Sequence, residues 1–313
     1  MAGTFAHICL VNSACTPEGL NTIPTLIPSV RAALENYQPF CRLGAVSPDC
    51  PALVGQDCAT GWSNIMHYVQ PADFVRYAIP KLVGLSFSNA DTRACIAWLF
   101  GYTAHLVTDY TIHPIVEKRV GPYSIKKNRA PHRLCEFDQD VHIFHKLTGK
   151  EVVETDFLQF SGLAECGVKG SIQKLNRPVA ELWKYCLQQY PRSDTKPFVR
   201  LPSMSLTLDN WFATYLNLMK NFATKPKSIA HFWGMTYRRY DKVDSSYIED
   251  LATPRPSQKI HYDDLFETAQ RNIIAAWTEL ANALDQEDRK LFKLPNGNLD
   301  TGRDENGKSI YWS

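Results

Sequence analysis

The chain has 313 residues, of which 44% are hydrophobic and 21% charged, and its formal net charge is +2 at pH 7. This composition is ordinary for a globular protein, and the length allows one large core or two modest ones. Nucleic acid is not favoured as a partner, because nucleic-acid-binding surfaces usually carry a strong basic excess. No apolar run approaches the roughly 18 residues that span a bilayer, so no transmembrane segment is expected.

The segment from Met1 to His7 contains no basic stretch, long apolar run or small-residue cleavage site. We therefore expect no signal peptide and a protein that is cytoplasmic as synthesised, with export or delivery by a signal-independent route left open. None of the nine cysteines forms a C-x-x-C pair. They are expected to be mostly buried free thiols.

Helical periodicity dominates the chain, and no alternation of β-branched residues predicts a strand. The fold class predicted is all-α, a multi-helix bundle. A Gly/Pro-rich loop is expected over residues 43–51, a basic loop over 124–129, and a loop-rich tail from about residue 289. Helices are predicted over residues 25–37, 71–83 with a break or kink at Pro80, 88–113 with an end at Pro114, from 131 onward, and near 169–190, 205–222 and 262–284.

Three potential metal ligands lie along the helix predicted over residues 88–113. His105, Asp109 and His113 are spaced i, i+4, i+8. Because each four-residue step turns about 400°, the three side chains share one helix face. His105 and Asp109 can share one metal ion, whereas His113 lies about 12 Å from His105 along the axis and would serve another. Such polar groups on an apolar helix are costly unless each is paired or bound to a metal.

A second pair occurs on the next predicted helix, where His132 and Glu136 are also spaced i, i+4. Imidazole and carboxylate ligands suit zinc, and three protein ligands with one open position are typical of catalytic zinc. One His-x-x-x-Asp pair alone is a weak signal, but two ligand sets on successive helices are far more specific. The HD-type phosphohydrolases need an adjacent His-Asp pair, which is missing, and di-iron bundles use Glu-x-x-His.

The ordered set of ligands resembles that of the zinc-dependent phospholipase C family, which is related to the fungal single-strand nucleases. In that family an early histidine, an aspartate in a Pro-Asp loop and a histidine after a tryptophan precede two helical ligand sets. Residues 1–147 contain each of these in order: His7, Asp49, His67, His105, Asp109, His113, His132 and Glu136.

The resemblance implies zinc as the cofactor, with two or three ions per chain held between core helices. One ion would be bound by Asp49, His67, His105 and Asp109. A second would be bound by His113, His132 and Glu136. The third would be bound by His7, by Asp109 as a bridge between two ions, and by the amino group of Ala2 after removal of Met1.

Asp49 and Glu136 are the residues expected to carry catalysis. By the resemblance, Asp49 would act as general base. Glu136 would be a zinc ligand, and it favours a lipase because the nuclease relatives tend to have aspartate there. Residues 1–150 would form the catalytic core, and residues 151–313 a helical extension packed on it in one continuous domain.

The function implied is a zinc-dependent phospholipase C that hydrolyses the glycerol-side phosphodiester of phospholipids to diacylglycerol and a phosphorylated headgroup. Its partners would be a phospholipid substrate and, through peripheral contact, the membrane surface. Two alternatives stay open. One is a zinc-dependent nuclease or other phosphodiesterase, and the other is a non-catalytic helical scaffold stapled by zinc.

Overall fold

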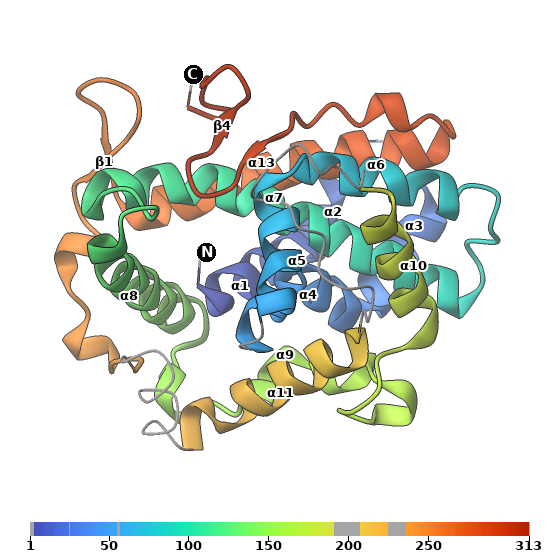
Figure 1. Ribbon diagram of the computed structural model, residues 1–313, viewed down its shortest axis with the longest axis horizontal. Coiled ribbons are helices and arrows are strands. Elements are labelled where there is room, and N and C mark those ends of the chain that lie inside the picture. The colour runs from blue at the N-terminus through green and yellow to red at the C-terminus, as the bar shows by residue number, and fades with distance from the viewer. Residues whose placement is uncertain (1–2, 25, 55–56, 191–206, 225–235, 313) are drawn as a thin grey trace.

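The computed structural model describes residues 3–24, 26–54, 57–190, 207–224 and 236–312 (Figure 1). The predicted all-α fold class is confirmed. The α-helices are α1 (Thr4–Ala14), α2 (Pro17–Asn21), α3 (Pro28–Asn36), α4 (Gln38–Val46), α5 (Asp57–Tyr68), α6 (Pro71–Leu82), α7 (Ala90–Val120), α8 (Arg129–Thr148), α9 (Phe157–Ser161), α10 (Arg177–Gln188), α11 (Leu208–Thr224) and α13 (Tyr262–Asp285).

Short 3-10 helices and two small strand pairs connect these helices. The 3-10 helices are η1 (Cys50–Val54), η2 (Lys126–Asn128), η3 (Val152–Glu154), η4 (Leu163–Cys166), η5 (Val168–Gly170), η6 (Tyr240–Lys242), η7 (Ser245–Tyr247) and η8 (Arg289–Leu291). The antiparallel strands are β1 (Leu251–Ala252) with β2 (Lys259–Ile260), and β3 (Gly297–Asn298) with β4 (Arg303–Asp304).

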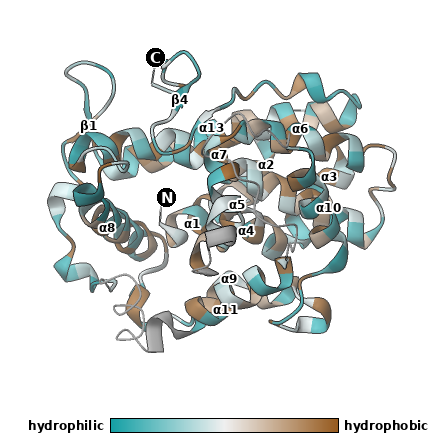
Figure 2. Ribbon diagram, viewed as in Figure 1, coloured by the Kyte–Doolittle hydropathy of each residue, from teal (hydrophilic) through white to brown (hydrophobic). Residues whose placement is uncertain are grey.

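Helix α7 is the centre of the fold, with α3, α4, α6, α10 and α13 packed around it. Its side chains are buried almost continuously from Thr92 to Val116, as expected for a helix that is apolar on every side. Figure 2 shows hydrophilic residues in the outer loops that carry β1 and β4, and also on the outer helices such as α8. Helix α13 joins the second half of the chain to the first through α7. The domain boundary near residue 150 remains a prediction.

Two glycines allow α4 to lie directly on α7. A Cβ on Gly44 would lie 2.0 Å from the carbonyl oxygen of Trp98, and a Cβ on Gly101 would lie 1.8 Å from that of Cys41. Only glycine permits this approach of the two backbones. Because the helices are so close, the carbonyl of Ala45 on α4 reaches the imidazole of His105 on α7.

The predicted helices and loops need several corrections. Helices α1, α2, α4, α5 and α9 are not among the predicted ones. In α1 the residues from Phe5 to Val11 are all buried, so the sequence shows no apolar stripe. The loop expected over residues 43–51 is wrong in its first part, because α4 continues to Val46, and its end from Cys50 is helical in η1. The predicted basic loop likewise contains η2.

The prediction that the long helix ends at Pro114 is wrong. Proline removes only one backbone N–H, and the burial of Ile115 and Val116 favours continuation of the helix. Helix α7 ends instead at Val120, and the φ of +89° at its C-cap residue Gly121 is a conformation that favours glycine. The sequence also predicts a break or kink at Pro80. Helix α6 is not broken there, because it continues through Pro80 to Leu82.

Eight of the nine cysteines are buried free thiols, as predicted. The side chain of Cys58 is not among those that the structure describes. Within the described part of the chain, every helix is too short or too polar to cross a membrane.

Candidate metal centre

Four helices and one turn bring eight side chains to a single buried place between the core helices. Helix α1 supplies one, the turn after α4 one, α5 one, α7 three and α8 two. Each is at most 6% exposed. In chain order they are His7, Asp49, His67, His105, Asp109, His113, His132 and Glu136. The ninth predicted ligand, Ala2, lies outside the described residues.

Asp109 lies in the middle of this cluster. Its Oδ1 is 3.3 Å from His7 Nε2 and 3.5 Å from His113 Nε2. Its Oδ2 is 3.3 Å from His105 Nε2 and 4.0 Å from His67 Nε2. One carboxylate therefore faces imidazoles from three helices, which is the arrangement that a bridging ligand requires.

The eight side chains form three groups with metal-binding potential. Within each group the possible ligand atoms lie within 4.8 Å of one another. The groups are His7 with His105 and Asp109, Asp49 with His67 and His105, and His113 with His132 and Glu136. Asp49 Oδ1 is 3.1 Å from His67 Nε2, and Glu136 Oε1 is 3.1 Å from His132 Nε2.

Backbone carbonyls orient three of the imidazoles. Nδ1 of His67 donates to the carbonyl of Ser63 at 2.7 Å, and Nδ1 of His105 donates to that of Ala45 at 2.8 Å. Nδ1 of His113 donates to the carbonyl of Leu299 at 2.9 Å. These bonds fix the tautomer, so each Nε2 is left as a lone-pair donor toward the cluster, as in metal-ligating histidines.

The cluster contains buried polar atoms that a cation would satisfy. Within the described residues, Nε2 makes no aligned hydrogen bond in four histidines, although the carboxylates lie nearby. Each such buried atom costs about 1–3 kcal/mol if it stays unsatisfied. Mixed imidazole and carboxylate donors suit zinc, so the residues present fit a zinc cluster. The four are His7, His105, His113 and His132.

The carboxylates are held in the ionised form that binds metals. Burial alone would raise the pKa of Asp109, but the imidazoles of His113 and His105 keep it well below its usual range. The pKa of Asp49 is likewise lowered by His105 and His67 in spite of burial. Burial lowers the pKa of His105 and favours its neutral form, which binds metals.

Two cavities border the cluster. One, of about 240 Å³, is lined by Asp49 and Glu136, and the other, of about 820 Å³, is lined by His67. Tyr123 lines both. The other polar residues on the walls include Thr60, Tyr68, Arg129, Arg133, Asn298 and Asp300. The cluster is therefore open to small molecules at both its aspartate and its histidine edges.

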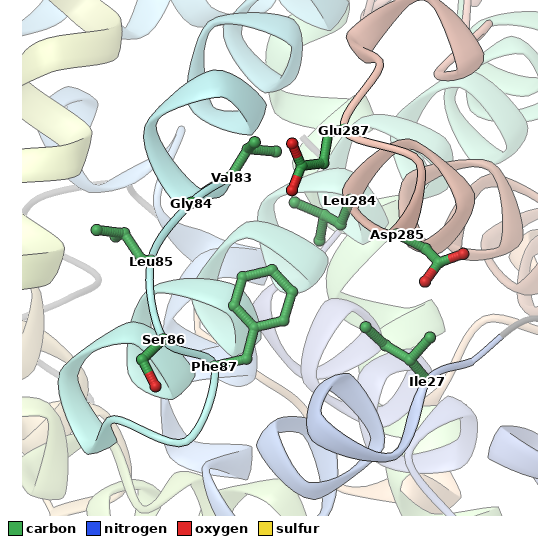
Figure 3. A pocket seen from close by; sticks show the side chains of 9 residues that line it. All are labelled: Ile27, Val83, Gly84, Leu85, Ser86, Phe87, Leu284, Asp285 and Glu287. Atoms are coloured by element: carbon green, nitrogen blue, oxygen red, sulfur yellow. The ribbon is translucent and has the colours of Figure 1, made fainter.

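A third cavity, of about 400 Å³, lies away from the cluster and shares no lining residue with it. Figure 3 shows Phe87, Leu284 and Ile27 beside its two acidic side chains, Asp285 and Glu287. Because its charged lining residues are both acidic, it offers no cationic group for a phosphate.

A fourth group of potential ligands was missed in the sequence because its members are about 120 positions apart. His142 on α8 lies close to His261 and Asp263 at the start of α13. Asp263 is already bonded: its Oδ1 is 2.8 Å from His142 Nε2, and its Oδ2 is 2.8 Å from Lys146 Nζ. Its backbone N–H donates to Nδ1 of His261, the N-cap residue. These contacts make the group a cap for α13.

Comparison with known proteins agrees with this geometry. The profile of the family described as zinc dependent phospholipase C matches residues 6–200. No curated protein and no solved structure matches the chain. The matched residues include all eight side chains of the buried cluster. The chain therefore belongs to the zinc-dependent phospholipase C family.

Proposed function

We propose that the protein is a phospholipase C, which hydrolyses the glycerol-side phosphodiester of phospholipids to diacylglycerol and a phosphorylated headgroup. Family membership supports the general activity. The observation that carries the proposal is the buried His/Asp/Glu cluster, which opens into a cavity between Asp49 and Glu136. A non-catalytic scaffold, in which the metal only stabilises the fold, would need no such opening.

The proposed ligand sets overlap with the three groups of side chains, and they share Asp109 between two ions. Asp49, His67, His105 and Asp109 would hold one zinc ion. His113, His132 and Glu136 would hold a second. His7, Asp109 and the amino group of Ala2 would hold a third. When bound, zinc supplies Lewis-acid chemistry, lowering the pKa of a water ligand and neutralising charge on phosphoryl oxygens.

In this proposal Asp49 acts as general base. It lines the 240 Å³ cavity, where its carboxylate faces the space open to a small molecule, and its lowered pKa keeps the carboxylate ionised. His67, at 3.1 Å from Asp49 Oδ1, orients the carboxylate. Arg133 lines the same cavity, where its guanidinium suits phosphoryl oxygens of the substrate.

We propose that the rim of the larger cavity contacts the membrane surface. Tyr68, which lines this cavity, is 41% exposed, and Ile125 beside its lining residue Ser124 is 45% exposed. Lys126 and Lys127 follow at once in the chain. An exposed apolar side chain next to basic residues is a pattern that suits the surface of anionic lipids.

Diacylglycerol release from mixed phospholipid vesicles tests the proposal, with and without chelator. We expect release by the zinc-loaded protein, loss with chelator, and loss in Glu136→Ala. His142→Ala, a change outside the cluster, is the matched control and should retain activity. No release from zinc-loaded protein would overturn the phospholipase proposal, and cleavage of single-stranded nucleic acid in the same panel would favour the nuclease alternative.

A further inference from the structure

The C-terminal residues 295–312 lie against the metal centre, although they are outside the stretch matched by the family profile. Leu299 contacts two predicted ligands through its backbone. Its carbonyl accepts the Nδ1–H of His113 at 2.9 Å, and its N–H donates to the carbonyl of His67 at 3.1 Å. One residue thus connects α7 with α5 at the centre. Leu299 is fully buried, so these bonds are shielded from water.

The close approach of this segment to α7 depends on Gly302. A Cβ at this position would lie 2.5 Å from Cγ of Pro114 and 2.6 Å from the carbonyl oxygen of Tyr110. Gly302 has a φ of +61°, and its carbonyl accepts the N–H of Ile310 at 2.9 Å. The glycine therefore lets the segment pack on the turn of α7 that carries His113.

Both ends of the segment are anchored to core helices. At one end, Asn296 Oδ1 accepts the backbone N–H groups of Ala72 and Asp73, in the first turn of α6. At the other end, the indole N–H of Trp312 donates to the carbonyl of Thr111 on α7 at 2.9 Å, and Trp312 is 5% exposed. The chain between these anchors cannot move away from the centre without breaking buried hydrogen bonds.

We propose that residues 295–312, here named the C-terminal clasp, orient the imidazole of His113 and hold the backbone of His67 for zinc binding. The inference rests on the zinc centre proposed above. A histidine whose Nδ1–H is held by a carbonyl presents Nε2 in one tautomer and one orientation, which raises its affinity for the metal. Leu299 and Gly302 are positioning residues, because neither lines the two cavities beside the centre.

The chain offers a matched pair of substitutions to test the clasp. Gly302→Ala and Gly307→Ala both place alanine at positive φ, +61° and +76° respectively. No atom lies within 4 Å of a Cβ on Gly307, so only the change at Gly302 pushes the clasp away from α7. Zinc affinity is measured by competition with a chromogenic chelator, and ligand geometry by the visible spectrum of the cobalt-substituted protein. Circular dichroism checks that each variant is folded.

We expect Gly302→Ala to weaken binding of the zinc ion at His113 about 10- to 100-fold and to alter the cobalt spectrum. Gly307→Ala should behave as the wild type. If Gly302→Ala does not fold, Trp312→Phe decides, because it removes the indole N–H and its bond to Thr111 while keeping an aromatic ring at this position; it should weaken binding of the same ion. Wild-type affinity and spectrum in a folded Gly302→Ala, or in Trp312→Phe where that variant decides, would overturn the clasp. Failure of the wild type to bind zinc would instead overturn the proposed centre.

Discussion

Ala6 donates its backbone N–H to the carboxylate of Asp140 at 2.7 Å, and Phe5 donates to the same carboxylate at 3.2 Å. These N–H groups belong to the first turn of α1, whose N-cap residue Gly3 has no side chain to satisfy them. A Cβ on Gly3 would lie 2.2 Å from the carboxyl group of Asp140. An aspartate of α8 thus caps the helix that carries His7.

Loss of this cap should weaken both the fold and the proposed third zinc ion. Asp140→Ala leaves the two buried N–H groups without their acceptor, and we expect a loss of about 2–4 kcal/mol in the free energy of unfolding. Urea denaturation and zinc content measure the two effects. Asp138→Ala is the control, since Asp138 is also buried but accepts the N–H of Asp244 instead. Equal zinc loss in both variants would contradict this role of Asp140.

Removal of zinc should destabilise the whole protein, because buried ionised carboxylates lose the cations that neutralise them. For free zinc a thousandfold above its dissociation constant, the loss is about 4 kcal/mol. The melting temperature should then fall by about 10 °C. Thermal unfolding with and without chelator measures this. Zinc should restore the original value and magnesium should not, since imidazole ligands do not suit magnesium; an unchanged melting temperature would contradict a structural contribution of the metal.

The central carboxylate should matter for more than one ion. Asp109 faces His7, His105 and His113 at 3.3–3.5 Å, and these histidines belong to different groups, whereas Glu136 faces only His113 and His132 of its own group. We expect Asp109→Ala to lose two zinc ions per chain and Glu136→Ala to lose one, as measured by elemental analysis of folded protein. Diacylglycerol release should fall about 10³-fold or more in both, since several kcal/mol of transition-state stabilisation are removed. Equal ion loss would argue against a bridging Asp109.

Acid should remove the contribution of Asp263. Burial would raise its pKa, but Lys146 and His142 lower it below the usual range. A carboxylate with a lowered pKa in the folded state stabilises the protein above its unfolded pKa of about 4, and loses this effect as the pH falls through its folded value. Asp263→Asn should therefore cost about 1 kcal/mol at pH 7 and progressively less below about pH 4. Urea unfolding of wild type and variant at pH 7 and below about pH 4 checks this. A destabilisation by Asp263→Asn that grows in acid would contradict it.

The proposed membrane rim predicts a separation of binding from chemistry. Ile125→Ser should reduce sedimentation of the protein with anionic vesicles by several-fold, because an exposed apolar side chain that enters the interface is lost. Hydrolysis of a short-chain, monomeric phospholipid should stay at the wild-type rate. Leu147→Ser is the control, since Leu147 is 48% exposed at the far end of α8 from the rim. Equal vesicle binding by both variants and the wild type would exclude this contact.

The sequence alone was sufficient where local geometry decides the outcome. Helical spacing places Asp109 beside His105 and His113, and Glu136 beside His132, whatever the rest of the chain does. The resemblance added the remaining ligands in order along the chain.

The meeting of these elements depends on packing between distant segments, which periodicity does not encode. Helix α1 escaped prediction because its apolar run is continuous, and α7 passes Pro114 because burial outweighs one missing hydrogen bond. The need for glycine at position 44 follows only from the close packing of α4 on α7. The contact of Leu299 with His113 spans 186 positions, and such long-range contacts form only when the folded core brings both segments to one place.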